Sequence, residues 1–298
     1  MTHVLYNSAS DNGKGYQNAL EVRDHVDGEL VFDDVCKITD MASFLADIPE
    51  AESVVLTGGD GTLNHFVNDI ANVDLKNDIY YYPTGTGNDF MKDVENFAKD
   101  GMIRINEYVR NLPVVYVNGI ERRFINGIGY GIDGYCCEVA DDIREKNGDA
   151  EINYTSIAIK GLLFHFKPAN ATVTVDGIKH TYKKVWLAPT MNGRFYGGGM
   201  NIAPDQDRLN EEKTLSVVLM HGSGKLKTLV VFPSIFKGEH IKHTEMVEIL
   251  TGKEITVEFD KPKALQIDGE TVRNVTSYTV KSSALVSKED KANEGLKV

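Results

Sequence analysis

The fold is decided by the stretch Leu56-Thr57-Gly58-Gly59-Asp60-Gly61-Thr62-Leu63-Asn64. A short apolar run at 53–56 predicts a buried strand before it, and apolar residues from Leu63 to Ile70 follow at helical spacing. Glycine has no Cβ, so such a loop can turn sharply and bring bare N–H groups against a phosphate. We expect Thr62 to be the N-cap of the helix, whose positive end would point into the loop. The stretch predicts a nucleotide-binding strand-loop-helix unit.

A second glycine loop follows about 25 residues later and reads Pro83-Thr84-Gly85-Thr86-Gly87-Asn88-Asp89-Phe90. The pattern of the first 100 residues predicts strands near 3–7, 30–36, 53–57 and 78–82 and helices near 15–27, 40–47, 62–71 and 88–98. Alternation of this kind indicates βαβ units and a parallel sheet flanked by helices. Both glycine loops then leave the carboxyl ends of strands, so we expect them to converge on one ligand.

The pattern changes from about residue 112 to many short strands separated by turn signals. The predicted strands are 114–118, 122–126, 172–176, 182–188, 215–220, 247–250, 254–259, 264–268 and 277–280. Their regular spacing favours an antiparallel sandwich or barrel, interrupted by helices near 133–146, 154–166 and 224–236. The fold class predicted is therefore an N-terminal α/β domain with a parallel sheet and a C-terminal antiparallel β-sandwich.

Bulk properties exclude several classes of protein. A length of 298 residues suits two domains, and a net charge of −12 argues against a nucleic-acid binder, which neutralises phosphates with Lys and Arg. The first residues enter a strand-like run directly and no apolar stretch approaches 18 residues, so we expect neither a signal peptide nor a membrane span. The three cysteines form no disulfide framework and fit a reducing cytoplasm.

Six motifs in one order resemble the diacylglycerol kinase, sphingosine kinase and NAD kinase superfamily, and most closely its bacterial soluble lipid kinase branch. They are the two glycine loops, Phe124-Ile125-Asn126 with Gly131-Ile132-Asp133, and the stretches 198–205, 237–240 and 265–270. The resemblance implies an NAD kinase-like nucleotide-binding domain at 1–112, to which a segment of about 284–298 returns. It also implies a β-sandwich lipid-binding domain at 113–283 and a site in the cleft between the two.

The resemblance implies ATP and Mg²⁺ as the nucleotide and its metal. The residues expected beside the nucleotide are Asn7, Lys14, Thr57, Gly58, Gly59, Gly61, Thr62, Thr84, Gly85, Thr86, Gly87, Asn88 and Lys92. A helix cap at Asn88 and a solvated helix face for Lys14 and Lys92 are the structural alternatives. The loop after the first strand departs from the family's Asn-Pro-x-Ser-Gly and is longer, which leaves the placement of Lys14 open.

Three acids are the candidates for catalysis and for the magnesium ion. Asp60 could bind Mg²⁺, act as general base, or cap local N–H groups. Asp268 and Glu270 form the second acidic site, although Asp-Gly between β residues is also a hairpin signal. In an extended segment both side chains would point to one face. Our choice for the base is Asp268, with Asp60 nearer the phosphates.

The lipid side of the site rests on fewer residues. Asn126 and Asp133 are expected to bind the acceptor, as the resemblance implies, while the alternative for Asp133 is an N-cap. Asp205 and Asp207 stand where related bacterial enzymes bind a structural divalent ion, but the altered spacing argues against that ion here. The apolar segment 154–166 is either core or, helped by Lys160 and Lys167, an interfacial docking helix.

These observations predict a cytoplasmic, peripherally membrane-associated lipid kinase that transfers the γ-phosphoryl group of MgATP to a lipid hydroxyl, with diacylglycerol as acceptor and phosphatidic acid as product. Its partners are ATP, a lipid and a membrane surface, without nucleic acid, and a homodimer is allowed. One alternative is an NAD kinase-like activity on a soluble metabolite. Another is a nucleotide-binding regulatory protein that has lost catalysis.

Overall fold

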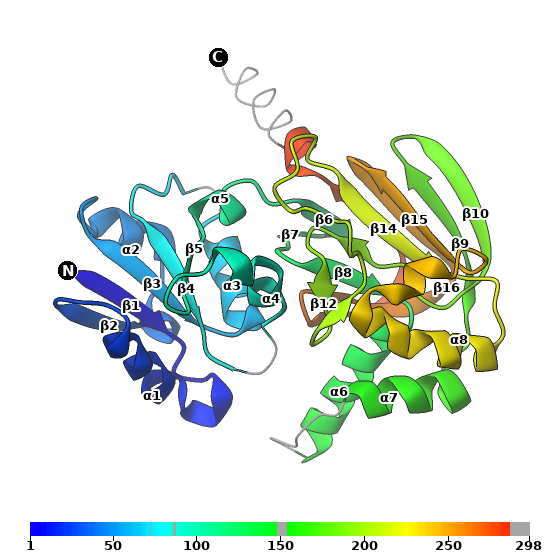
Figure 1. Cartoon of the computed structure of the whole chain (residues 1–298), viewed down its shortest axis with the longest axis horizontal. Coiled ribbons are helices and arrows are strands. Elements are labelled where there is room, and N and C mark those ends of the chain that lie inside the picture. Colours follow the sequence, from blue (N-terminus) through cyan, green and yellow to red (C-terminus); the bar gives the residue numbers. More distant parts are fainter. Residues whose placement is uncertain (72, 86–87, 148–153, 287–298) are drawn as a thin grey trace. The chain divides into compact units, whose positions relative to one another are not determined.

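The computed structural model describes residues 1–71, 73–85, 88–147 and 154–286 (Figure 1). The chain divides into two compact units, Met1–Asn111 and Leu112–Val298. Each unit has its own sheet and its own hydrophobic core.

The first unit is built on a five-stranded sheet with the order β2-β1-β3-β4-β5. Its strands are β1 (Thr2–Tyr6), β2 (Leu30–Asp34), β3 (Ser53–Gly58), β4 (Ile79–Pro83) and β5 (Ile103–Arg104). The first four are mutually parallel, as predicted, whereas β5 runs antiparallel to β4. β5 has only two residues, so it gave no periodic signal in the sequence.

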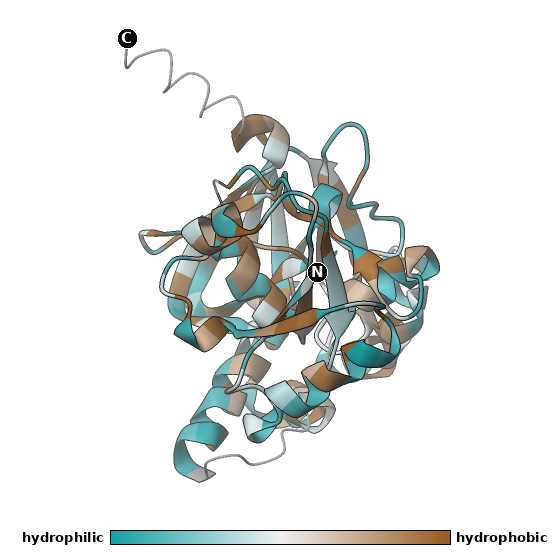
Figure 2. Ribbon diagram, turned by 90° about the vertical axis from the view of Figure 1, so that its left-hand side faces the viewer, coloured by the Kyte–Doolittle hydropathy of each residue, from teal (hydrophilic) through white to brown (hydrophobic). Residues whose placement is uncertain are grey.

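Helices cover both faces of this sheet. They are α1 (Gly15–Ala19), α2 (Met41–Asp47), α3 (Asp60–Asp69), α4 (Asp89–Val94) and α5 (Asn106–Val109), and 3-10 turns at Leu20–Asp24 and Glu95–Phe97 extend α1 and α4. Ala19 and Val22 pack with Val4 and Val55 on one face. On the other face the His3 ring meets Phe44 of α2, and the Tyr81 ring meets Phe90 of α4. The ribbons of the helices carry both hydrophilic and hydrophobic segments, as expected when one side of a helix is buried (Figure 2).

The second unit is an antiparallel sheet structure with the strand order β15-β14-β11-β8-β16-β17-β6-β7, to which β9 and β10 attach through β16. Its strands are β6 (Val114–Val117), β7 (Ile120–Arg123), β8 (Gly127–Tyr130), β9 (Ala169–Val175), β10 (Ile178–Val185), β11 (Thr190–Met191), β14 (Leu215–Met220), β15 (Val247–Gly252), β16 (Glu254–Ile267) and β17 (Glu270–Lys281), with β12 (Phe195–Tyr196) and β13 (Met200–Asn201) forming a separate pair. The predicted fold class is confirmed.

One long strand, β16, belongs to both halves of this sheet. Its first half pairs with β9 and its last three residues pair with β8, while β17 follows it on the other edge. The sequence predicted two strands here, at 254–259 and 264–268. They are one strand whose register is irregular between Glu258 and Lys263. The stacked rings of Tyr130 and Phe259, 4.0 Å between centroids, lie in the core that the two halves share.

Helical segments pack on a second core, around Trp186. They are α6 (Ile132–Asn147), α7 (Tyr154–Lys160) with a π-helical turn at Gly161–His165, and α8 (Lys225–Val231) with 3-10 turns at Phe232–Lys237 and Glu239–Lys242. Within the described residues no helix combines the length and apolar character that crossing a membrane requires. The expected return of 284–298 to the first unit concerns a segment whose last twelve residues, 287–298, lie outside the described part.

Candidate active site

The first glycine loop is a sharp turn between β3 and α3. Gly59 is the N-cap residue and α3 begins at Asp60, so the expectation of an N-cap at Thr62 was wrong by three residues. The difference arises because the turn is completed within Gly58 and Gly59. A Cβ on Gly58 would lie 2.5 Å from the Thr62 Cβ, which requires glycine there. A Cβ on Gly61 would meet nothing within 4 Å, so packing does not explain why this residue is a glycine.

The two glycine loops lie side by side, as predicted. The Thr84 N–H donates to the Gly58 carbonyl at 2.9 Å, and the Tyr81 hydroxyl donates to the same carbonyl at 2.9 Å. A Cβ on Gly59 would stand 3.8 Å from Asn88 Oδ1. Thr86 and Gly87 lie outside the described residues. The described parts of the two loops are therefore in contact at the carboxyl edge of the sheet.

Asp60 joins the loops as a helix cap. Its Oδ2 accepts the Asp89 N–H at 2.7 Å and its Oδ1 accepts the Phe90 N–H at 3.2 Å, so the carboxylate sits on the first turn of α4. Burial and, secondarily, the charge of Asp60 raise the pKa of Tyr81 well above its usual value. Asp60 thus caps the neighbouring helix, α4. The two hydrogen bonds of this cap fix the direction of the Asp60 carboxylate.

The remaining residues predicted beside the nucleotide divide into buried and exposed ones. The Thr57 hydroxyl is buried and donates to the Leu5 carbonyl at 3.0 Å. Asn7 Oδ1 accepts the Ala9 N–H at 2.9 Å and orders the loop after β1. The Asn88 amide donates to the Gly85 carbonyl at 2.8 Å, inside the second glycine loop. Lys14 and Lys92 are exposed at the start of α1 and in α4.

In the second unit, Asp268 occupies the hairpin turn between β16 and β17. Its φ is +45°, so the expectation of an extended segment with Asp268 and Glu270 on one face was wrong. The carboxylate accepts three backbone N–H groups, from Ile125 at 2.6 Å and from Asn126 and Gly127 at 2.9 Å each. Glu270 is exposed at the first position of β17. Asp268 therefore holds the segment before β8 and is fixed in orientation by it.

A residue that the sequence analysis missed completes this network. Arg208 donates to the Ile125 carbonyl at 2.9 Å and to Asn126 Oδ1 at 3.1 Å. Asn192 donates to the same Ile125 carbonyl at 3.0 Å. The Asn126 side chain is thus held from one side by Arg208 while its N–H is held by Asp268. Arg208 is the one cation in an otherwise acidic segment, 205–212, and that was its signal in the sequence.

Asp133 is a buried acid in the first turn of α6. The helix begins at Ile132, so Asp133 lies within that turn and the N-cap alternative was wrong. The Tyr196 hydroxyl and the Gly134 N–H lie close enough to its carboxylate to offset part of the effect of burial on its pKa. Burial raises the pKa of Tyr196 well above its usual value, and the charge of Asp133 raises it further. Burial raises the pKa of Asp133 from 3.8 to about 6. A buried carboxyl group with a raised pKa is typical of functional sites.

The segment with Asp205 and Asp207 is closed by amide side chains. Gln206 is buried, donates to the Thr214 carbonyl at 3.0 Å and accepts the Ser216 hydroxyl at 2.6 Å. Asn210 also donates to the Thr214 carbonyl, at 3.0 Å. Across the described ranges, no group of three His, Cys, Asp or Glu side chains is gathered to hold a metal ion. The Gln206 and Asn210 amides therefore close the loop that carries Asp205 and Asp207.

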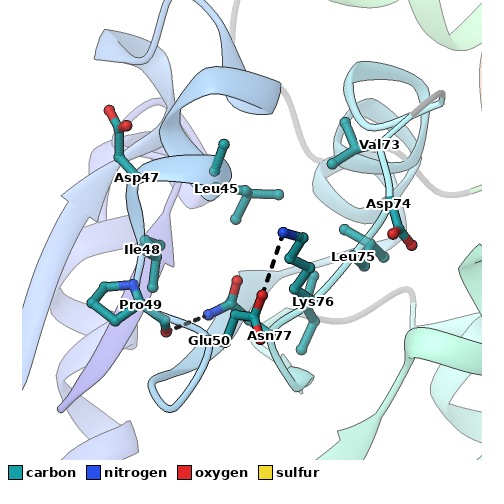
Figure 3. Close-up of a pocket in the computed structure, with 12 residues that line it drawn as sticks. Leu45, Asp47, Ile48, Pro49, Glu50, Val73, Asp74, Leu75, Lys76 and Asn77 are labelled. Atoms are coloured by element: carbon teal, nitrogen blue, oxygen red, sulfur yellow. Dashed lines mark hydrogen bonds and ion pairs between the residues drawn. The ribbon is translucent and has the colours of Figure 1, made fainter.

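A cavity of about 290 Å³ lies at the opposite edge of the first unit's sheet. It is lined by the segments 45–50 and 73–77, which precede β3 and β4, and by Ile79 at the start of β4, whereas the glycine loops follow these strands. Lys76 and Glu50 form an exposed ion pair of 3.3 Å at its rim, and the Asn77 amide donates to the Pro49 carbonyl at 2.8 Å (Figure 3). None of the predicted site residues lines this cavity.

Comparisons with known proteins agree with this architecture. The model of the diacylglycerol kinase catalytic domain matches residues 1–113, and that of the YegS C-terminal NAD kinase beta sandwich-like domain matches residues 126–285. A diacylglycerol kinase of Mycobacterium tuberculosis (strain ATCC 25618 / H37Rv) is 28% identical over 218 residues, 71% of this chain and 67% of its own length. One of Bacillus subtilis (strain 168) is 26% identical over 231 residues, 76% of this chain and 73% of its own.

A crystal structure of a diacylglycerol kinase from Bacillus anthracis str. Sterne superposes with a TM-score of 0.62 at 18% identity, over 95% of this chain and 94% of its own, which shows a shared fold. The YegS model alone covers more than half of the chain. Together with the match of the catalytic-domain model to residues 1–113, this match shows that the chain belongs to the diacylglycerol kinase and YegS-like family of ATP-dependent lipid kinases.

Proposed function

We propose that the chain transfers the γ-phosphoryl group of ATP to the hydroxyl of diacylglycerol and releases phosphatidic acid and ADP. The observation that carries the proposal is the pair of glycine loops joined by the Thr84 to Gly58 hydrogen bond and capped together by Asp60. Two bare backbone turns at one sheet edge suit a polyphosphate, which binds backbone N–H groups. The diacylglycerol kinases among its relatives support the choice of acceptor.

On the donor side, the glycine loops and their flanking residues would bind the phosphates of ATP. Gly61 supports this role because an added Cβ would meet no protein atom, so packing does not explain the glycine. Lys14 and Lys92, both exposed, would supply positive charge to the phosphates. Such local charge is needed because the whole chain carries −12 and repels ATP at long range.

On the acceptor side, Asn126 and Asp133 would bind the polar end of the lipid, and Asp268 would take the proton of its hydroxyl. The acceptor oxygen bonds to the γ-phosphorus as the bond from phosphorus to the bridging oxygen breaks, and ADP leaves with that oxygen. Mg²⁺ neutralises phosphate charge when bound. The carboxylates of Asp60, Asp268 and Glu270 are the hard oxygen donors proposed to hold it.

The decisive experiment follows the label from γ-labelled ATP with Mg²⁺ and either dispersed diacylglycerol or NAD. We expect label in phosphatidic acid, and a loss of about 10²- to 10⁴-fold in rate for Asp268→Asn if it is the general base. Asp60→Asn should lower the rate and also weaken ATP binding if this residue holds the metal ion. Label in NADP would favour the metabolite kinase, and label in neither product would favour the regulatory protein without catalysis.

The chain offers a matched control for Asp268. Asp176 also occupies an Asp-Gly hairpin turn, with φ +47°, and its carboxylate accepts the backbone N–H groups of Lys253 at 2.9 Å and Glu254 at 2.8 Å. Asp176→Asn therefore removes the same kind of turn capping without touching the proposed site. If both variants lost activity equally, turn capping would account for the effect and the catalytic role of Asp268 would be wrong. A cytoplasmic peripheral location and a homodimer stay predictions.

A further inference from the structure

Large apolar side chains are exposed on two adjoining helical segments of the second unit. Phe164, in the π-helical turn after α7, is 71% exposed. On α8, Leu226 is 76% exposed and Val230 is 79% exposed. We call these three residues the α7–α8 patch. Figure 1 shows α7 and α8 next to each other in this unit.

The segments adjoin because their inner sides share one core. Leu162, Phe166 and Val231 are buried together in the cluster that contains Trp186. The Lys225 ammonium group donates to the Leu163 carbonyl at 3.3 Å and ties the start of α8 to the π-helical turn. Both segments are therefore fixed by their buried sides.

On α8 the two faces are clearly divided. Thr228 and Val231 are buried, whereas Leu226 and Val230 stand four residues apart on the outer face. The segment 154–166 likewise has a buried side and an exposed side, because Leu162 and Phe166 belong to the core while Phe164 is exposed. The core does not explain why leucine, valine and phenylalanine occupy these outer positions.

The two segments that carry the patch have a net charge opposite to that of the whole chain. The segments 154–167 and 221–238 contain Lys160, Lys167, Lys225, Lys227 and Lys237 and no aspartate or glutamate, in a chain with 44 acidic residues and a net charge of −12. One of these lysines, Lys227, pairs with Glu245 at 2.7 Å. Exposed apolar side chains set among lysines match the chemistry of an anionic bilayer surface, where apolar groups enter the interface and cations contact the headgroups.

We propose that the α7–α8 patch docks the second unit on an anionic lipid bilayer. This inference rests on the proposed function in one respect, because a diacylglycerol acceptor resides in a membrane and the enzyme must reach it there. Phe164, Leu226 and Val230 enter the interface, and the lysines of the two segments face anionic headgroups. Docking in this way requires no change in the core, since the buried faces of both segments stay in place.

The test is cosedimentation of the full chain with vesicles of phosphatidylcholine alone or with added phosphatidylglycerol. We expect binding to the anionic vesicles that weakens as NaCl screens the lysines. The double variant Leu226→Asp/Val230→Asp should reduce the partition coefficient by at least about tenfold, because it removes two apolar groups and adds two negative charges. Ile178→Asp is the matched control, since Ile178 is 65% exposed on β10 outside the patch and should bind as the wild type does.

The outcomes separate the patch from the proposed function. Activity on diacylglycerol in detergent micelles should be preserved in the double variant, which shows that the fold and the chemistry are intact. A wild type that phosphorylates micellar diacylglycerol without binding anionic vesicles would overturn the docking proposal alone. Patch-dependent vesicle binding without any lipid phosphorylation would overturn the proposed function alone. If the double variant changed a dimer into a monomer and kept its vesicle binding, the patch would be a contact between copies and the docking proposal would be wrong.

Discussion

Replacing Asp133 by asparagine should stabilise the second unit at neutral pH, although it alters a residue of the proposed acceptor site. Burial raises the pKa of this carboxyl from 3.8 to about 6, so the charged form is less favourable in the folded protein than in the unfolded chain. A shift of about 2 units corresponds to about 3 kcal/mol. Asparagine has no charge to bury, and Asp133→Asn should recover up to this free energy of unfolding at pH 7.5.

The sign of the pH dependence follows from the direction of the shift. Because the folded state binds the proton more tightly, the contribution of Asp133 to stability is fully present below pH 3.8 and is lost as the pH rises through about 6. At pH 5 the variant should exceed the wild type by about half as much as at pH 7.5, a difference of about 1.4 kcal/mol between the two conditions.

Urea unfolding measured by tryptophan fluorescence tests this directly. Trp186 is the only tryptophan of the chain and lies in the same core as Ile132, which precedes Asp133, so its signal reports the unit concerned. Glu145→Gln, an exposed position on the same helix, is the control and should show no such pH dependence. If Asp133→Asn and the wild type differed by the same free energy at pH 5 and pH 7.5, the burial argument would be refuted.

Two further predictions concern the glycine loop and the thiols. Gly58→Ala should lower the free energy of unfolding by about 2 kcal/mol or more, because its methyl group would meet the first turn of α3, whereas Gly61→Ala should leave stability within about 0.5 kcal/mol and still weaken ATP binding. Calorimetry and nucleotide titration distinguish the two variants, and equal stability losses would contradict the packing argument. Ellman's reagent should label the native protein at Cys36, which is exposed, and spare Cys136 and Cys137, whose pKa values burial raises, to about 12 for Cys137. Rapid reaction of all three thiols would contradict this assignment.

The fold of the first unit could be predicted from the sequence because its signals are local. Short apolar runs mark β1, β3 and β4, and between them apolar residues recur at helical spacing. Each glycine loop marks the end of a strand. The misplaced start of α3 shows the limit of this reasoning. A threonine is the better side-chain cap, but two glycines complete the turn earlier and let the backbone of Gly59 take that position.

Where the sequence analysis failed, contacts distant in the chain decided the outcome. Asp268 could be found from its motif, but its three N–H partners come from a segment about 142 residues away, so its turn conformation was assigned wrongly. Arg208 was missed for the same reason, since its partners are Ile125 and Asn126. β8 and β11 are short segments that are strands only because they pair with neighbouring strands of the sheet. No periodicity in four or two residues can indicate such strands.

The dual pairing of β16 has a mechanical consequence for the second unit. One uninterrupted backbone, with Pro262 in its irregular stretch, pairs with β9 in one half of the sheet and with β8 in the other. Loosening either half would disturb a strand that the other half also needs, so the two halves are mechanically coupled. We expect this unit to unfold cooperatively, with its slowest-exchanging amides distributed along β16 on both sides of Pro262.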